Sequence, residues 1–213
     1  NLTATTQYRA VVQNGVCSSV NTTAVTITVN AVSVGGTVAG AATVCYGTNS
    51  GTLTLSGNTG TIVRWESSVN GGTSWSNIAN TTTSQAYTNL TQTTAYRALV
   101  KSGVCDSAYS SSTTITVNAL SNGGSAPDQT ICTGSTPADI TLTGVVGTVI
   151  RWERSADNTF PANKTTTITN TTTTLTGASI GALTSTLYIR VYAQNSPCSA
   201  VYSSTITITV KIG

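Results

Sequence analysis

The chain has 213 residues, of which only 7% are charged, against roughly a quarter in an average soluble domain. Nine basic and six acidic residues give a net charge of +3, and histidine is absent. The basic residues are scattered along the chain without a cluster, which argues against a nucleic-acid-binding surface, and the lack of histidine removes the usual base of a nucleophilic triad. Alternating runs of Thr, Ser, Val and Ile predict an all-β fold rather than helices or disorder.

The sequence repeats itself. Residues 1–31 return as residues 89–119 with 19 of 31 positions identical, and residues 61–66 return as residues 148–153. A period near 90 residues suits a string of complete small domains, because solenoid repeats are shorter. We therefore expect tandem immunoglobulin-like β-sandwiches joined by short linkers.

We call these the first, second and third repeat. Residues 1–31 are expected to be the C-terminal strands of a truncated repeat, and residues 32–119 and 120–213 to be complete repeats. An isolated hairpin is marginal in water. Residues 1–31 therefore either belong to a module whose remainder lies in a longer chain or complete a sheet supplied by another chain, and we expect the former.

In the second repeat, residues 52–56 and 62–67 have the period of strands. Strict alternation predicts that Val63 and Trp65 face the core, with Glu66 outward. The third repeat places Ile150 and Trp152 in the same pattern. A core Trp beside outward charges is typical of an immunoglobulin-like sandwich.

The Arg-Trp-Glu triplet predicts a surface ion pair. Glu66 is expected to pair across the sheet with Arg97, and Glu153 with Arg190, as cross-strand neighbours of opposite charge do. Trp75 differs because it lies in a polar loop and has no evident counterpart in the third repeat. It is a candidate ligand contact that could stack on a glycan, although packing at the rim of the sandwich is the favoured interpretation.

Five cysteines occupy matching places in the repeats, early (Cys45 and Cys132) or late (Cys17, Cys105 and Cys198). Pairing early with late inside one repeat uses each repeat identically, which predicts Cys45–Cys105 and Cys132–Cys198 disulfides and leaves Cys17 unpaired by truncation. A closed loop of about 60 residues would stabilise each repeat by roughly 4 kcal/mol. Persistent disulfides indicate an extracellular location.

No residue set predicts catalysis. The six acidic residues are scattered over two repeats, and no phosphate-binding or dinucleotide-binding motif is present, so we expect neither an enzyme nor a cofactor. Single cysteines without histidine make metal ligation improbable, and too few carboxylates exist to hold calcium at the joints. No apolar run is long enough for a membrane span, so this segment is not expected to insert into a membrane.

The pattern of Cys-x-Gly, an alternating strand, Trp65, Thr-rich loops, the late Cys105 and a closing Thr-Ile-Thr-Val strand resembles the Ig-like repeats of large Bacteroidota surface proteins. Trp65 stands 20 residues after Cys45, too far for the core disulfide of antibody domains. Ser107 lies in an Asp-Ser-Ala triplet that resembles the O-glycosylation motif of that bacterial group.

The resemblance implies a structural or adhesive segment of a long, secreted cell-surface protein: the stalk or filament of an adhesin, including the gliding-motility type exported by type IX secretion. It implies other repeats of the same chain, surface polysaccharide or glycans, and the export machinery as partners. Two alternatives stay open. The modules could themselves bind carbohydrate or a host surface, or they could be a non-catalytic spacer of a secreted enzyme.

Overall fold

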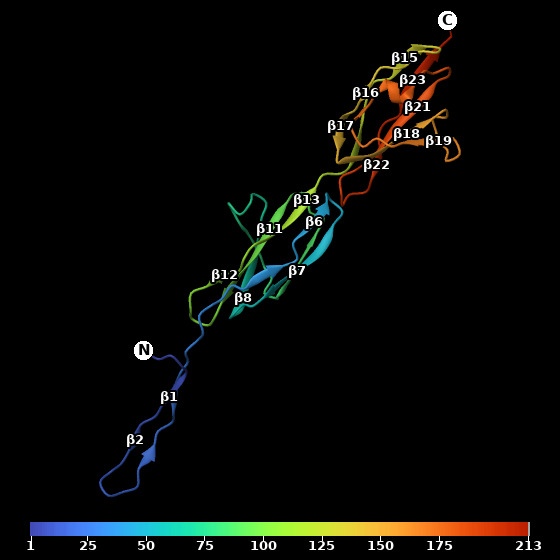
Figure 1. Ribbon diagram of the computed structural model, residues 1–213. Coiled ribbons are helices and arrows are strands. Elements are labelled where there is room, and N and C mark those ends of the chain that lie inside the picture. The colour runs from blue at the N-terminus through green and yellow to red at the C-terminus, as the bar shows by residue number, and fades with distance from the viewer. Residues whose placement is uncertain (213) are drawn as a thin grey trace. The chain divides into compact units, whose positions relative to one another are not determined.

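The computed structural model describes residues 1–212 and consists almost entirely of strands and loops. The described residues contain one helical turn, α1 (Gly177–Ile180). The chain forms two compact units (Figure 1). Unit one comprises Asn1–Ala41, Gly51–Tyr87 and Thr94–Thr114, and unit two comprises Ala42–Ser50, Thr88–Thr93 and Ile115–Gly213.

Unit one begins with a hairpin that lies within the first repeat. Its strands are β1 (Thr6–Tyr8), β2 (Val11–Val12), β3 (Val20–Asn21) and β4 (Val25–Ile27). The pairs β1 with β4 and β2 with β3 are both antiparallel, so this segment pairs with itself. Its valines and its tyrosine are largely exposed, and it has no buried side chain of its own.

Two sheets form the body of the second repeat. The smaller has the order β10-β7-β5 and the larger the order β6-β13-β11-β8-β9, with β12 beside β11. The bounds are β5 (Thr37–Ala39), β6 (Ala42–Cys45), β7 (Ser50–Ser56), β8 (Thr61–Ser68), β9 (Ser76–Ile78), β10 (Ser84–Thr88), β11 (Thr94–Lys101), β12 (Ala108–Tyr109) and β13 (Thr113–Asn118).

Unit two contains the third repeat, whose larger sheet has the order β15-β23-β21-β18-β19, with β22 beside β21. Two strand pairs, β14 with β17 and β16 with β20, complete the fold. The bounds are β14 (Asn122–Ser125), β15 (Gln129–Cys132), β16 (Ile140–Thr141), β17 (Thr143–Val146), β18 (Thr148–Ser155), β19 (Thr165–Ile168), β20 (Thr174–Leu175), β21 (Leu187–Gln194), β22 (Val201–Tyr202) and β23 (Ile206–Lys211).

One tryptophan anchors the core of each complete repeat. Trp65 and Trp152 are fully buried, as predicted. Because a buried indole N–H needs a partner, each donates a hydrogen bond to a loop carbonyl: Trp65 Nε1 to Thr82 O at 2.9 Å, and Trp152 Nε1 to Thr172 O at 3.0 Å. The core of the third repeat packs aliphatic side chains around Trp152, including Ile140, Leu142, Ile189, Val191, Ile206 and Ile208. The predicted all-β, immunoglobulin-like class is confirmed.

A β-bulge alters the predicted inward face in both repeats. On β8, Leu99 is opposite Arg64 and Val100 is opposite Ile62, so the register skips Val63. Val63 is 42% exposed and Ile62 is buried, which makes the prediction of a core Val63 wrong. The extra residue of a bulge reverses the alternation beyond it.

The same shift occurs on β18. Its register with β21 moves from Val149 to Arg151, leaving Ile150 without a partner. Ile150 is 39% exposed while Val149 is buried, so the prediction of an inward Ile150 is also wrong. The bulge is therefore a repeated feature of the fold.

Candidate functional site

The Arg-Trp-Glu triplet builds a cluster of buried charge. Glu66 lies opposite Arg97 in the register of β8 with β11, and the Arg97 Nε is 2.8 Å from the Glu66 Oε2. Arg64, two residues before Glu66, donates a second hydrogen bond, from its Nε to Oε1 at 2.8 Å. The predicted pair is confirmed, but the Glu66 side chain is only 3% exposed rather than on the surface.

The surrounding charges control the ionisation of Glu66. Burial acts to raise its pKa, but hydrogen bonds from Arg97 and Arg64, together with their positive charges, outweigh burial and hold the pKa of this carboxyl below its ordinary value. Glu153 in the third repeat has a lowered pKa for the same reasons, through Arg190 and Arg151. Both carboxylates are therefore ionised at neutral pH and fully occupied by their partners.

Aromatic rings cover the arginine of each cluster. The Arg97 guanidinium lies 4.1 Å from the ring centroid of Trp75 and 3.8 Å from that of Tyr109. The Trp75 Nε1 donates a hydrogen bond to Gly72 O at 2.9 Å, which fixes the loop after β8. Trp75 is thus packed on Arg97, while its role as a ligand contact stays an untested prediction.

The third repeat has a counterpart of Trp75 that the sequence did not reveal. The Arg190 guanidinium lies 4.1 Å from the ring centroid of Phe160 and 3.6 Å from that of Tyr202. Phe160 therefore takes the place of Trp75, and the expectation that Trp75 has no counterpart is wrong. The signal was an aromatic residue in the corresponding loop: Phe160 stands seven residues after Glu153, whereas Trp75 stands nine residues after Glu66, so an alignment at one fixed shift does not match them. Because both repeats contain an equivalent cluster, we interpret it as a contribution to the stability of the fold.

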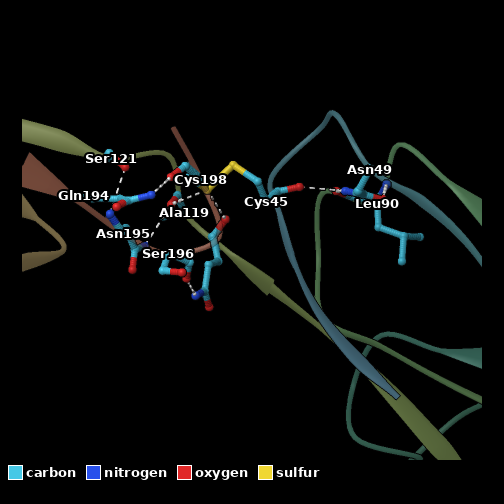
Figure 2. The surroundings of a disulfide bond; sticks show 10 residues. Cys45, Asn49, Leu90, Ala119, Ser121, Gln194, Asn195, Ser196 and Cys198 are labelled. Atoms are coloured by element: carbon cyan, nitrogen blue, oxygen red, sulfur yellow. Dashed lines mark hydrogen bonds between the residues drawn. A yellow bond between two sulfur atoms is a disulfide. The ribbon is translucent and has the colours of Figure 1, made fainter. Parts of the chain in front are cut away.

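The disulfide of the structure joins two different repeats. The Sγ atoms of Cys45 and Cys198 are bonded, with their Cα atoms 4.9 Å apart and 153 positions apart in sequence. Figure 2 shows this bridge between the early cysteine of the second repeat and the late cysteine of the third. The predicted Cys45–Cys105 and Cys132–Cys198 pairs are wrong. Pairing an early cysteine with the late cysteine of the next repeat preserves the repeat symmetry equally well, so symmetry alone did not select the partner.

Parallel pairing places Cys45 at this joint. Strand β6 runs parallel to β13, with Cys45 opposite Asn118, so the cysteine lies at the end of the second repeat where the chain leaves for the third. Asn49 then holds the turn after β6. Its Nδ2 donates to Cys45 O at 2.7 Å and to Leu90 O at 2.8 Å, while its Oδ1 accepts from Leu90 N at 2.9 Å (Figure 2).

Backbone and amide hydrogen bonds surround the bridge on the side of the third repeat. Asn118 Nδ2 donates to Ser196 O at 2.7 Å, and Asn195 Nδ2 donates to Ala119 O at 2.8 Å. Asn195 N donates to Ser121 Oγ at 2.8 Å (Figure 2). The linker residues are therefore hydrogen-bonded to the loop that carries Cys198.

The other predicted site residues take no part in the Cys45–Cys198 disulfide. Among residues 1–212, Cys17, Cys105 and Cys132 are free, with Cys17 and Cys132 exposed and Cys105 partly buried. Ser107 is exposed in the loop before β12, so it is accessible, and its glycosylation stays a prediction.

Within residues 1–212, no group of three or more His, Cys, Asp or Glu side chains is placed to hold a metal ion. The described part of the chain also contains no helix long and apolar enough to cross a membrane. The chemistry that these residues do show is a disulfide between two repeats and ion pairs of the buried Glu66 and Glu153 with arginines.

Solved structures similar to this chain include bacterial adhesins. One is the structure titled "Ca2+-stabilized adhesin helps an Antarctic bacterium reach out and bind ice", with 14% identity, a TM-score of 0.41, and coverage of 99% of this chain and 57% of that one. A 1.5-MDa bacterial ice-binding adhesin has 13% identity, a TM-score of 0.41, and coverage of 97% and 74%. The four N-terminal Ig domains of Dscam1 isoform 6.9 have 16% identity, a TM-score of 0.40, and coverage of 84% and 46%.

No curated protein matches the sequence. One family model, described as "Domain of unknown function (DUF8696)", matches it at residues 1–31, 34–119 and 121–212. Since these matches together take in nearly every residue, the chain belongs to the DUF8696 family.

Proposed function

We propose that this chain is a structural and adhesive repeat segment of a long, secreted bacterial cell-surface protein, in which consecutive repeats form a stalk or filament. The observation that carries this proposal is the Cys45–Cys198 bridge, because it links one repeat to the next by a second covalent connection. Persistent disulfides belong to oxidising surroundings, which supports an extracellular location. No catalytic role is proposed, because the charged clusters are saturated by their own ion pairs.

The bridge gives the segment a load-bearing property. A pulling force on the two ends passes from Cys45 through the disulfide to Cys198, so the residues between them form a closed loop that tension cannot extend. With a separation of 153 residues, reduction would release about 50 nm of extensible chain, at the reach of roughly 3.3 to 3.6 Å per residue. A stalk that transmits force to a distal element benefits from this protection.

Single-molecule force spectroscopy of the 213-residue chain, tethered at its two ends, tests the proposal. The oxidised chain should extend by about 50 nm less than the chain carrying Cys45→Ser and Cys198→Ser. The matched control is Cys17→Ser, which removes an exposed free thiol and should leave the extension of the oxidised chain unchanged. Equal extension of the oxidised and bridge-less chains would contradict the load-bearing role.

The proposal includes a location on the cell surface and export by type IX secretion. An antiserum against the 213-residue chain should label intact cells of the source organism and reduce their attachment or gliding. Loss of that labelling in a strain without type IX secretion would support the Bacteroidota adhesin type that the sequence resembles. Labelling only after permeabilisation would contradict a surface location.

Carbohydrate binding by the repeats themselves is the second hypothesis, and the Trp75 loop is where it would occur. The structure favours it less, because one face of the Trp75 ring is occupied by Arg97. Glycan binding by the chain that disappears in Trp75→Ala, with folding retained, would establish this hypothesis. A role as the spacer of a secreted enzyme would require a catalytic domain elsewhere in the same protein.

A further inference from the structure

The free Cys105 sits in the same surroundings as the bonded Cys198. Cys105 Sγ lies 3.5 Å from Ala31 O, and Cys198 Sγ lies 3.3 Å from Ala119 O. Ala31 and Ala119 are equivalent positions of the first and second repeats, since residues 1–31 align with residues 89–119. Cys105 therefore contacts the last residue of the first repeat. Cys198 contacts the last residue of the second repeat in the same way.

A second contact recurs at both joints. Ser102 N donates to Ser33 Oγ at 2.9 Å, and Asn195 N donates to Ser121 Oγ at 2.8 Å. The two serines occupy the same linker position, and the two donors stand three residues before Cys105 and Cys198. The loop that carries the late cysteine is thus docked on the linker in the same way, whether or not its thiol is bonded.

The free Cys132 likewise reproduces the setting of the bonded Cys45. In the parallel pairing of β15 with β23, Cys132 lies opposite Lys211, as Cys45 lies opposite Asn118 in the pairing of β6 with β13. The N–H of the residue after each cysteine donates to the carbonyl of Asn118 or Lys211, at 2.9 Å in both cases. Cys132 is exposed at the far end of the third repeat.

We propose that Cys105 and Cys132 are the two open halves of the bridge that Cys45 and Cys198 form, each made to bond the complementary cysteine of an adjoining repeat in the same chain. Cys105 would take an early cysteine from a preceding repeat, and Cys132 a late cysteine from a following one. The inference does not rest on lone thiols, because the equivalent pair is already bonded in this molecule. It deepens the proposed stalk function and rests on it.

The crosslinking step needs a disulfide oxidant, such as oxidised glutathione. One cysteine thiolate attacks the oxidant to form a mixed disulfide and releases one glutathione thiolate, and the second cysteine thiolate then attacks the mixed disulfide and releases the other. The two cysteines lose two electrons and two protons, which the two glutathione thiols carry away. Repeated at every joint, this reaction closes overlapping loops along the array.

An extended chain tests the proposal. A copy of residues 32–88 placed before Asn1 completes the first repeat, and a copy of residues 121–213 placed after Gly213 adds a fourth with the natural linker spacing. The first copy carries Tyr46→Phe, and the second carries Thr133→Ala and Ser199→Thr, so that mass spectrometry distinguishes the copied Cys45, Cys132 and Cys198 from the natural ones. The chain is oxidised with a glutathione buffer, digested without reduction and mapped.

The expected map contains three bridges: Cys45 of the added copy with Cys105, Cys45 with Cys198, and Cys132 with Cys198 of the added copy. A Cys132→Ser variant of the extended chain should lose only the third. In the 213-residue chain, Cys105 and Cys132 should react with iodoacetamide while Cys45 and Cys198 do not.

Several outcomes would overturn the proposal: a Cys132 that stays free in the extended chain, that bonds Cys198 of its own repeat, or that links separate chains into multimers on a non-reducing gel. If Cys45–Cys198 forms and the other two bridges do not, this inference alone fails. If Cys45–Cys198 is itself missing, the proposed load-bearing function fails as well.

Discussion

Replacing Glu66 with Gln should unfold the second repeat at a markedly lower temperature. The Glu66 side chain is 3% exposed and receives Arg97 and Arg64, whose side chains are 23% and 31% exposed. Removing one partner of a fully buried ion pair costs about 3 to 5 kcal/mol, and the partial exposure of the arginines lowers the expected loss to about 2 kcal/mol. That loss corresponds to a decrease in melting temperature of about 10 °C for a domain of this size.

The effect should depend on pH in a definite direction. Because the folded pKa of Glu66 is lowered, its carboxylate stabilises the fold at pH values above the unfolded pKa, and this contribution is lost as the pH falls through the folded pKa. Thermal unfolding followed by circular dichroism at pH 7 and near pH 3 should therefore show a smaller difference between wild type and Glu66→Gln in acid. Asp106→Asn is the matched control, since it makes the same charge change at an exposed position. Equal melting temperatures for Glu66→Gln and wild type at pH 7, or an equal loss in the control, would refute the reasoning.

Three further substitutions test other parts of the account. Trp75→Ala should lower the free energy of unfolding of the second repeat by about 1 kcal/mol, because it uncovers the Arg97 guanidinium. Phe160→Ala should cost the third repeat about 3 kcal/mol, because the Phe160 ring is itself buried and its removal leaves a cavity beside Arg190. Val69→Ala, at an exposed position, is the control in chemical denaturation. Asn49→Ala should cost about 2 kcal/mol, since it leaves the Leu90 N–H and carbonyl without their side-chain partner, and amide hydrogen exchange at Leu90 should accelerate; unchanged exchange there would contradict the role of this side chain.

Local patterns in the sequence predicted most of the sandwich. The period of two placed the strands, and the Arg-Trp-Glu triplet placed Trp65 in the core with Glu66 facing Arg97. Strict alternation failed at Val63 and Ile150, because a bulge adds one residue to one strand, and the sequence carries no separate mark for it.

Local sequence patterns could not predict the partner of Cys45 in the disulfide. Repeat symmetry allows an early cysteine to pair inside its repeat or with the next repeat, and only the spatial position of the strand ends decides between them. The parallel pairing that brings Cys45 beside Asn118 puts it at the joint, where Cys198 arrives from the following repeat. Phe160 was missed because its spacing from the Arg-Trp-Glu triplet is two residues shorter than that of Trp75, and only their equivalent contacts with Arg190 and Arg97 show that the two rings correspond.

The central claim is that the bridge joins repeats rather than closing them. Non-reducing digestion and mass spectrometry of the oxidised 213-residue chain, with free thiols blocked beforehand, test it directly. The account predicts one linked peptide pair, Cys45 with Cys198, and blocked thiols at Cys17, Cys105 and Cys132. Linked peptides of Cys45 with Cys105, or of Cys132 with Cys198, would contradict it.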